Sequence, residues 1–269
     1  MTWLWLFPPP PTNILLIGLD QRPGESVASR TDSLILTRVD LEKNHLVLVG
    51  IPRDLWVVLP DGSQNRINTA HYFAELNESG SGPLAAVDTV SANFGLTLHY
   101  YVRVNFDGFR ALIDSIGGIE INIEKRIYDD LYPTDDYGYQ TIVFEPGLQT
   151  LNGEQALQYA RTRHGSSDFE RAKRQQQVIA AFISRLYKPT TWFRLPAIWA
   201  AFQSAIQTNL SPLMLAKVAY ATMRLGTENI ERVVLEPPMV QGFITDAGAS
   251  VQLPQWQQIN PVLLELFGE

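Results

Sequence analysis

The stretch SLILTRVDLEKNHLVLVGI, residues 33–51, predicts two neighbouring strands of a buried sheet. Its two apolar runs, residues 33–39 and 45–51, are short and bounded by turn residues, as buried strands are. The polar residues 40–44 between them are typical of a turn that joins a strand pair. A third apolar run, NILLIGL at residues 13–19, precedes them and ends on Asp20. The core of the fold is therefore expected to be a sheet that contains these three strands.

Strand and helix signals alternate along the rest of the chain. Further strands are expected where short apolar runs end in turn residues, at residues 55–59, 100–104, 119–123, 141–144 and 230–235. Helices are expected from helical spacing and from Pro and Gly at their ends, at residues 83–94, 107–116, 152–159, 169–187 and 212–225. The alternation predicts an α/β fold with a mixed, mostly antiparallel sheet flanked by helices.

Three segments are less regular. Residues 128–139 are rich in Tyr and Asp and are expected to form a loop or lid. Residues 191–206 are apolar and aromatic; we expect them to lie in the core or, if incompletely covered, to line an apolar slot. The tail after Pro238 is weakly patterned. Because no repeat or linker interrupts the chain, residues 13–269 are expected to form a single domain.

The N-terminal sequence MTWLWLFPPPP, residues 1–11, has an apolar run closed by four prolines. The run is too short to span a bilayer or to act as a signal peptide. Residues 1–12 are interpreted as the remnant of a membrane anchor followed by a stiff linker, or alternatively as a disordered end. Trp3 and Trp5 would suit a membrane interface.

Composition excludes several classes of protein. The net charge of −7 and the isoelectric point of about 5.2 argue against general nucleic-acid binding. The absence of cysteine excludes a disulfide scaffold, thiol catalysis and cysteine-ligated zinc. A phosphate-binding G-x-x-x-x-G-K-[ST] loop, a G-x-S-x-G nucleophile motif and an H-E-x-x-H zinc motif are also missing from the sequence.

Basic residues concentrate in LQYARTRHGSSDFERAKRQQQ, residues 157–177, which holds Arg161, Arg163, Arg171, Lys173 and Arg174. The pattern predicts a helix that ends near residue 159, an extended corner, and a second helix that a capping box of residues 167 and 170 opens. Guanidinium groups and a helix N-terminus that converge in this way are typical of a polyanion site. The alternative is a solvated charged helix face. His164 is interpreted as a hydrogen-bonding bystander.

Other charged groups follow predicted strands, in Gly18-Leu19-Asp20, Arg30-Thr31-Asp32 and Pro52-Arg53-Asp54. Ligands of α/β proteins gather at strand ends. Two carboxylates, Asp20 and Asp32, among several arginines suit a Mg²⁺-bound phosphate. Each aspartate alone is as readily explained as a turn residue. Spacing alone does not distinguish a catalytic site from a phosphate-binding pocket.

Seven motifs occur in one order between about residues 13 and 183: NILLIGLD, RTDSLILTRVD, VGIPRD, RINTAHY, YVRVNFDGF, DSIGGIEINI and GLQTLNGEQALQYARTRHGSSDFERAKRQQQVI. By these motifs the chain resembles the LytR-CpsA-Psr family of bacterial cell-wall polymer ligases. The resemblance implies a three-layer α/β/α sandwich with a hydrophobic tunnel for a polyprenyl chain. Residues after about 210 carry no motif that we match to the family.

The resemblance also implies an activity. Family members transfer polymers such as teichoic acids, capsular polysaccharides or arabinogalactan from a polyprenyl-pyrophosphate carrier to peptidoglycan, with Mg²⁺. An acceptor hydroxyl attacks the glycan-side phosphorus, and polyprenyl phosphate leaves. Members act at the extracytoplasmic face of the bacterial cytoplasmic membrane and are anchored by an N-terminal helix. Only a stub of such a helix is present in this sequence.

Carried over by motif, the resemblance assigns the charged residues to roles. Asp20 and Asp32 would hold the metal. Arg30, Arg53, Arg161 and Arg163 would bind the pyrophosphate, and Asp168, Arg171 and Gln175 would help to bind the head group. The residues expected to be catalytic are Asp32, Arg53, Arg161 and Arg163. Asp32 and Asp168 are both candidates for the general base.

Two other functions stay open at this point. Water in place of the sugar hydroxyl would make the protein a polyprenyl-pyrophosphate phosphatase. A non-catalytic lipid-phosphate binder or a transcriptional regulator is the other alternative, and the acidic charge and lack of a DNA-reading element disfavour the regulator. The expected partners are the lipid-linked glycan, peptidoglycan and the membrane surface, without nucleic acid.

Overall fold

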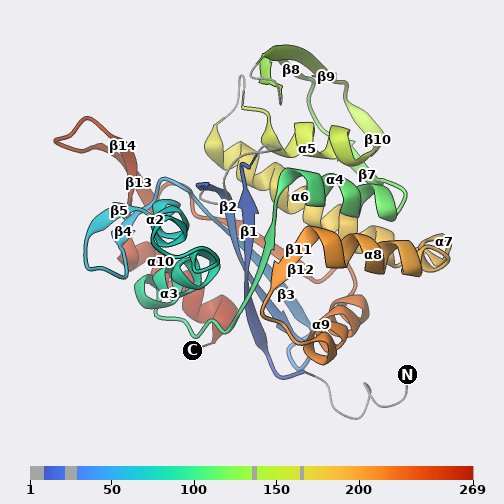
Figure 1. Cartoon of the computed structure of the whole chain (residues 1–269), viewed down its shortest axis with the longest axis horizontal. Coiled ribbons are helices and arrows are strands. Elements are labelled where there is room, and N and C mark those ends of the chain that lie inside the picture. The colour runs from blue at the N-terminus through green and yellow to red at the C-terminus, as the bar shows by residue number, and fades with distance from the viewer. Residues whose placement is uncertain (1–8, 22–28, 135–137, 164–166, 269) are drawn as a thin grey trace.

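The structure is a computed structural model that describes residues 9–21, 29–134, 138–163 and 167–268. Its centre is a six-stranded sheet with the strand order β11-β6-β1-β2-β3-β12 (Figure 1). The pairs β1–β2, β2–β3 and β6–β11 are antiparallel, and β1–β6 and β3–β12 are parallel. The sheet is therefore mixed and mostly antiparallel, as the sequence predicts.

The strands of the central sheet are, in chain order, β1 (Thr12–Leu19), β2 (Thr31–Asp40), β3 (His45–Ile51), β6 (Tyr100–Val104), β11 (Ile206–Thr208) and β12 (Ile230–Val234). The two-stranded sheets are formed by β4 (Trp56–Val58) with β5 (Gln64–Arg66), β7 (Ile119–Ile123) with β10 (Gly147–Leu151), β8 (Ile127–Pro133) with β9 (Tyr139–Phe144), and β13 (Val240–Ile244) with β14 (Ser250–Pro254). The helices are α2 (Thr69–Asn77), α3 (Gly82–Phe94), α4 (Phe106–Ser115), α5 (Gly153–Arg161), α6 (Asp168–Leu186), α7 (Pro189–Trp192), α8 (Leu195–Ala205), α9 (Pro212–Leu225) and α10 (Trp256–Phe267). In the part of the chain that the structure describes, none of these helices has the length and apolar character needed to cross a membrane.

Helices cover both faces of the sheet because side chains alternate along each strand. Leu15 and Ile17 of β1 belong to a core cluster that also contains side chains of α3 and α10. Ile14 and Leu16 point to the other face and join a cluster with side chains of α6 and α9. Figure 1 shows α2, α3 and α10 on one side of the sheet and α4, α6, α8 and α9 on the other. This is the predicted α/β/α sandwich.

A third core cluster lies beyond the end of the sheet, where β7 to β10 pack against α4, α5 and α6. The hairpin of β8 and β9 belongs to it, so the prediction of a loop at residues 128–139 is wrong for the described residues. Tyr132, Ile142 and Phe144 are buried there, whereas Tyr128 and Tyr139 face solvent. Most side chains of β8 and β9 face solvent, so the apolar pattern that predicts a strand is weak in this part of the sequence.

The C-terminal tail is an integral part of the main core, although its sequence pattern is weak. Ile259, Leu263 and Phe267 of α10 are buried in the same cluster as β1. Gln252 of β14 bridges Leu55 and donates its backbone N–H to the carbonyl of Asp54. The tail therefore braces the loop that carries Arg53.

The apolar segment after α6 is not core, and that prediction is wrong. The side chains of Trp192, Phe193 and Trp199 are exposed, and no residue of α8 is classed as buried. The physical reason is that α4 occupies the layer next to the sheet. Helix α8 packs on the outside of α4, so only one side of it is covered.

Candidate functional site

Asp32, at the start of β2, lines three cavities that meet around it. The first, of about 270 Å³, is apolar and lies between β1, β6, α4 and α6. The second, of about 260 Å³, reaches Pro52, Arg53 and Gln252. The third, of about 410 Å³, lies below the β8–β9 hairpin. An amphiphile with a charged head and an apolar chain would find both environments here.

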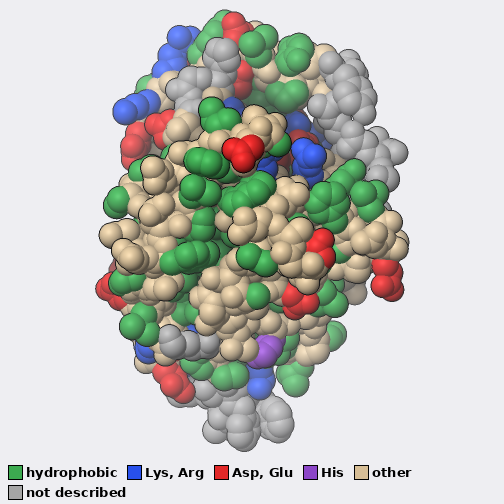
Figure 2. All heavy atoms as spheres, turned by 90° about the vertical axis from the view of Figure 1, so that its left-hand side faces the viewer, with side chains coloured by type: hydrophobic (Ala, Val, Ile, Leu, Met, Phe, Trp, Pro, Cys, Tyr) green, Lys and Arg blue, Asp and Glu red, His purple; other side chains and the backbone are tan. Residues whose placement is uncertain are grey.

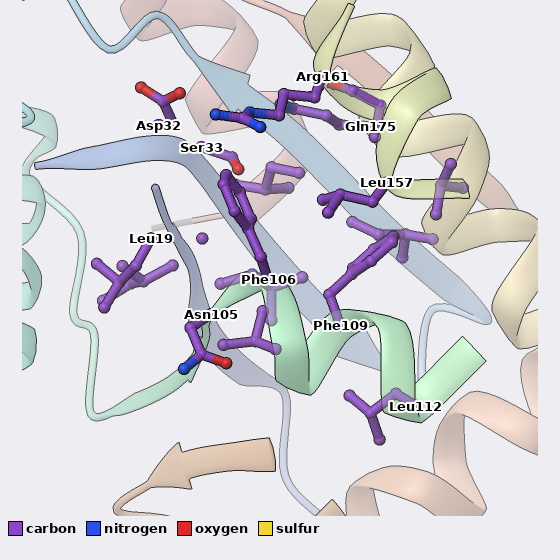
Figure 3. A pocket seen from close by; sticks show the side chains of 18 of the residues that line it. Leu19, Asp32, Ser33, Asn105, Phe106, Phe109, Leu112, Leu157, Arg161 and Gln175 are labelled. Carbon is purple, nitrogen blue, oxygen red and sulfur yellow. Dashed lines mark hydrogen bonds between the residues drawn. The ribbon is translucent and has the colours of Figure 1, made fainter. Parts of the chain in front are cut away.

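The apolar cavity has one polar end. In Figure 3, Asp32, Arg161 and Gln175 lie together at one end, and Phe109 and Leu112 of α4 lie toward the other. The remaining lining side chains are almost all aliphatic or aromatic. A cavity of this kind accepts an apolar chain and places its charged end group against Asp32 and Arg161.

Two capped helices, α5 and α6, position Arg161, Arg163 and Arg171, and we call these three residues and Thr162 the arginine corner. Helix α5 begins with a capping box of Asn152 and Gln155, and α6 begins with the predicted capping box of Ser167 and Glu170. Helix α5 continues to Arg161, two residues further than predicted, and the chain turns extended at Thr162. These ends fix where the backbone carries each guanidinium group.

Two interactions hold the corner in place. The hydroxyl of Thr162 donates to Asp129 Oδ2 at 2.6 Å, and both side chains are buried. Arg174 donates to the carbonyl groups of Tyr159 and Thr162 at the end of α5. The alternative of a solvated charged helix face is therefore wrong for Arg174, because this side chain satisfies carbonyls that the helix end leaves open. Lys173 does face solvent and pairs with Glu236.

Arginines from two segments that are distant in sequence, the loop after β3 and the end of α5, converge on the two predicted carboxylates. Arg53 and Arg163 contact the two oxygens of Asp32 at 2.8 and 3.0 Å. Arg161 contacts Asp20 at 3.1 Å. Burial alone would raise the pKa of Asp32, but the charges of Arg53, Arg163 and Arg171 together hold it below its ordinary value. Asp32 is thus an anion that positions two arginines.

Arg171 is the cation that the protein leaves least satisfied. Its side chain is 5% exposed, and it forms an ion pair with Asp168 at 3.3 Å. Among the described residues, its Nε and Nη1 atoms have no hydrogen-bond partner. Burial, together with the charge of Arg163, lowers the pKa of Arg171 to about 10. Since buried donors are normally paired, these atoms mark a place for an anionic ligand.

The structure brings eight of the nine predicted site residues to the three cavities. They are Asp20, Asp32, Arg53, Arg161, Arg163, Asp168, Arg171 and Gln175. The ninth, Arg30, is exposed and lies with its guanidinium carbon 5.8 Å from the ring centre of Tyr72. Figure 2 shows basic and acidic side chains together in a hollow in the upper part of one face. His164 lies outside the described residues.

Three carboxylates of the site lie where a metal ion could bind. Asp20, Asp32 and Asp129 line one cavity, so the oxygen donors that Mg²⁺ prefers are present. Within the described ranges, no group of three or more histidine or acidic side chains could hold a metal ion by itself. This donor set fits Mg²⁺ that one or two carboxylates share with phosphate oxygens of a substrate.

Sequence reasoning missed several groups that shape the site. The rings of Phe106 and Tyr132 lie 4.4 and 5.7 Å from the guanidinium carbon of Arg161. Asp129, which anchors Thr162, comes from the segment interpreted as a loop. Phe106 stands in the motif YVRVNFDGF, and an aromatic residue next to a strand end would have been the signal for it.

A buried ionic cluster lies next to the segment that leads into Asp32. His71 accepts at Nε2 from Arg103 at 3.0 Å and donates from Nδ1 to the Ser29 carbonyl at 3.1 Å. Arg103 also donates to Glu75 at 2.6 Å. Burial and the charge of Arg103 lower the pKa of His71 to about 4, so its ring is neutral at neutral pH. The motif RINTAHY holds His71, but its partners are distant in sequence.

Comparison with known proteins identifies the family. A model of the LytR_cpsA_psr family matches residues 9–262. The chain therefore belongs to the LytR-CpsA-Psr family, and the match extends beyond the motifs recognised in the sequence. A relative from Oceanobacillus iheyensis, named polyisoprenyl-teichoic acid–peptidoglycan teichoic acid transferase TagU, is 32% identical over 225 residues. The aligned region covers 81% of this chain and 66% of that relative.

Solved structures agree on the fold. The crystal structure of Bacillus subtilis TagV has a TM-score of 0.76 at 25% identity, over 96% of this chain and 98% of that chain. TagT bound to LIIa-WTA also has a TM-score of 0.76, at 22% identity over 96% and 90% of the two chains, and shows the likeness of fold alone. The chain spans 66% of the Oceanobacillus TagU sequence and 50% of the B. subtilis TagV sequence.

Proposed function

We propose that the protein is a transferase that moves a glycan polymer from a polyprenyl-pyrophosphate carrier to peptidoglycan. Membership of the family and the names of the relatives support a cell-wall polymer transferase. The observation that carries the proposal is the buried guanidinium of Arg171, whose Nε and Nη1 atoms have no hydrogen-bond partner among the described residues, at the charged end of an apolar cavity. An isoprenoid chain fills the cavity, and the pyrophosphate meets the arginines.

The charge balance of the site suits a pyrophosphate. Four arginines, Arg53, Arg161, Arg163 and Arg171, face three carboxylates of Asp20, Asp32 and Asp168. Arginine binds phosphate oxygens through two parallel donors, and such pairs strengthen where water is excluded. A bound pyrophosphate supplies the acceptors that Arg171 lacks and relieves the repulsion between the arginines.

In the proposed reaction, an acceptor hydroxyl of peptidoglycan attacks the glycan-side phosphorus. A new P–O bond forms, the bond to the bridging oxygen breaks, and polyprenyl phosphate leaves with the electron pair. The arginines neutralise the charge on the equatorial and leaving oxygens, which supplies most of the catalysis in phosphoryl transfer. The site holds the donor between the apolar cavity and the two polar ones, so that the acceptor approaches from the polar side.

The hydroxyl proton needs an acceptor. Asp32 is a weak base because two arginines hold its carboxylate and lower its pKa. Asp168 is 41% exposed in its side chain and has looser contacts, of 3.3 Å to Arg171 and 3.9 Å to Arg163. We therefore assign proton acceptance to Asp168 and the positioning of Arg53 and Arg163 to Asp32.

Mg²⁺ is part of the proposal. Asp20 and Asp32 would hold it together with the substrate phosphates, as the donor set of their shared cavity allows. A bound Mg²⁺ supplies further neutralisation of phosphate charge. We place the protein at the extracytoplasmic face of the cytoplasmic membrane, where its lipid-linked donor and peptidoglycan meet; the family resemblance supports this location.

The test supplies a labelled polyprenyl-pyrophosphate oligosaccharide and peptidoglycan oligomers, with Mg²⁺ or with a chelator. Label on peptidoglycan that requires Mg²⁺ is the expected result. Release of free sugar phosphate alone would make the protein a phosphatase, and retained lipid without turnover would make it a binder. Transfer that persists undiminished in chelator would remove Mg²⁺ from the mechanism while leaving the transferase intact.

A further inference from the structure

The segment after α6 exposes four large apolar side chains in a short space. Trp192, Phe193, Leu195 and Trp199 are 54%, 90%, 58% and 48% exposed, and we call these four residues the aromatic face. They lie on α7, on α8 and between them, on one flank of the molecule in Figure 1. Single exposed apolar residues are ordinary, but such a cluster indicates an interaction surface.

Helix α8, which carries part of the aromatic face, is closely packed on its inner side. Gly108 of α4 lies so close to α8 that a Cβ atom there would be 2.6 Å from the carbonyl oxygen of Ala205. Ile198 packs against the core cluster of α4 to α6. The ring of Trp199 stacks on Phe202 with centroids 6.0 Å apart and planes 7° from parallel. Helix α8 is therefore closely packed on one side, and the exposure of its apolar side chains does not result from a loosely packed helix.

The charge around the aromatic face differs from that of the rest of the chain. Residues 171–227 contain eight basic residues and no acidic one, so all 28 acidic residues lie outside this segment. Lys188 and Arg194 flank the aromatic residues. Glu120, which pairs with Lys188 at 2.5 Å, is the acidic neighbour contributed by β7. In a chain of net charge −7, this basic segment suits an anionic surface.

The aromatic face lies near the apolar cavity. Helix α8 runs directly into Ile206 of β11, which lines that cavity. Helix α4 lies between them: Phe109 and Leu112 line the cavity, and α8 packs on α4. Figure 3 shows Leu112 at the end of the cavity away from Asp32. The apolar end of the cavity and the aromatic face thus belong to one side of the molecule.

We propose that the aromatic face docks the protein onto a bilayer surface that carries anionic head groups. Tryptophan and phenylalanine beside lysine and arginine are the side chains that enter the head-group region of membranes. Docking in this orientation turns the apolar end of the cavity toward the lipid layer and the arginine corner toward the cell wall. The inference rests on the proposed function only in that a polyprenyl carrier is a membrane lipid.

The test measures binding of the full chain to sucrose-loaded vesicles of phosphatidylglycerol and phosphatidylcholine, without any polyprenyl lipid. The test variant is Trp192→Ser/Phe193→Ser/Trp199→Ser. The matched control is Phe243→Ser/Ile244→Ser on the β13–β14 hairpin, where the two side chains are 47% and 68% exposed. We expect the test variant to bind phosphatidylglycerol vesicles at least about tenfold more weakly and the control to bind as wild type does.

Two charge-reversal variants provide a second test of the proposal. Arg194→Glu should weaken binding to phosphatidylglycerol several-fold and leave binding to phosphatidylcholine unchanged, whereas Arg126→Glu, an exposed arginine of the β8 side, should change neither. Circular dichroism confirms that each variant is folded. Equal vesicle binding by wild type and the triple variant overturns the proposal.

A measurement of self-association tests whether a second copy of the chain, and not a membrane, covers the aromatic face. If sedimentation shows a concentration-dependent dimer that the triple variant abolishes, the face is an interface between copies and the membrane proposal is wrong. Transfer from a detergent-dispersed donor should stay within about twofold of wild type in the triple variant, since the face touches no reacting group. Loss of vesicle binding with transfer retained therefore tests docking independently of the proposed activity.

Discussion

The arginine corner and the aromatic face lie at opposite ends of α6 and invert the usual distribution of side chains in opposite ways. At the first end Arg171 is a buried cation, 4% exposed as a whole residue, and at the other Phe193 is 90% exposed. The 19 residues of α6 separate the two ends by about 28 Å. Each departure costs free energy in the isolated chain, the first through desolvated charge and the second through hydrated apolar surface.

The two regions differ in the kind of partner that would offset the free-energy cost of each. Unpaired guanidinium donors are satisfied by an anion, and exposed aromatic rings by an apolar or interfacial environment. In the proposed function, a membrane lipid with a pyrophosphate head would supply the anion, and the lipid layer from which it comes would supply the interfacial environment. The chain therefore keeps its two unfavourable features at the two ends of the path that its substrate would follow.

The largest effect is expected from breaking the charged end. Arg161→Ala should reduce transfer by about 10²–10³-fold, because it removes a preorganised donor to phosphate oxygens. The fold should lose only about 1 kcal/mol, from the contact with Phe106 and the pair with Asp20. Initial rates of label transfer and urea unfolding measure both. Arg126→Ala is the control, and gross unfolding of Arg161→Ala would count against its placement.

The second prediction concerns the buried ionic cluster of His71, Glu75 and Arg103. Unlike Arg171, the side chains of this cluster pair with one another. The pKa of His71 is about 4 in the folded chain against an ordinary 6.5, so the unfolded chain binds a proton first as pH falls. Stability should therefore be fully present above pH 6.5 and decrease by about 3 kcal/mol between pH 6.5 and 4.

Urea unfolding of wild type and His71→Gln at pH 7, 5.5 and 4 measures this dependence. The variant should be less stable at pH 7, because Arg103 and Ser29 lose their partner, and its stability should fall less steeply toward pH 4. His45→Gln, at a surface pair with Glu231, is the control histidine. Identical slopes in wild type and His71→Gln would exclude His71 as the titrating group.

A third variant separates function from stability at the charged end. Arg171→Met should raise the free energy of unfolding by about 2 kcal/mol, because an apolar side chain replaces a buried and incompletely paired charge. Transfer should fall strongly at the same time. Arg174→Met on the same helix is the matched control and should destabilise, since Arg174 holds the carbonyls of Tyr159 and Thr162. Equal destabilisation by both substitutions would mean that the buried charge of Arg171 does not lower the stability of the fold.

The smallest effect is expected at the aromatic face. Phe193→Ser should change the free energy of unfolding by no more than about 0.5 kcal/mol, as the ring is exposed in the isolated protein. Phe267→Ala, in the main core, should cost about 3–5 kcal/mol and serves as the reference for a buried ring. A large loss in Phe193→Ser would show that the ring is covered in solution.

Much of the sheet is predictable from sequence, because its strands are short apolar runs with clear ends. The predicted strands at residues 100–104 and 119–123 and the helix at 212–225 coincide with β6, β7 and α9. The capping box that opens α6 is also confirmed. In these places local propensity, pattern and turn chemistry agree. The strand predicted at residues 141–144 lies within β9, whereas β8 was missed because most of its side chains face solvent.

The site is less predictable, because it is assembled from segments that only the topology joins. The antiparallel pair of β1 and β2 sets Leu19 opposite Thr31, which brings Asp20 and Asp32 to one edge. Nothing in the spacing of those aspartates indicates that arginines from α5 and the loop before α6 will meet them. The orientation of the segment at residues 191–206 was unpredictable for a similar reason: composition records apolar character but not which layer is already filled.

The bracing of the Arg53 loop has a consequence for how the chain is made. Arg66, at the end of β5, donates to the carbonyl of Ser250, 184 residues later, and Gln252 bridges Leu55. Contacts between such distant segments form late, since the intervening chain must be ordered first. During synthesis, the contacts that brace the Arg53 loop therefore form only after β14 has emerged. Arg53 thus gains its support only after all strands of the central sheet have been synthesised.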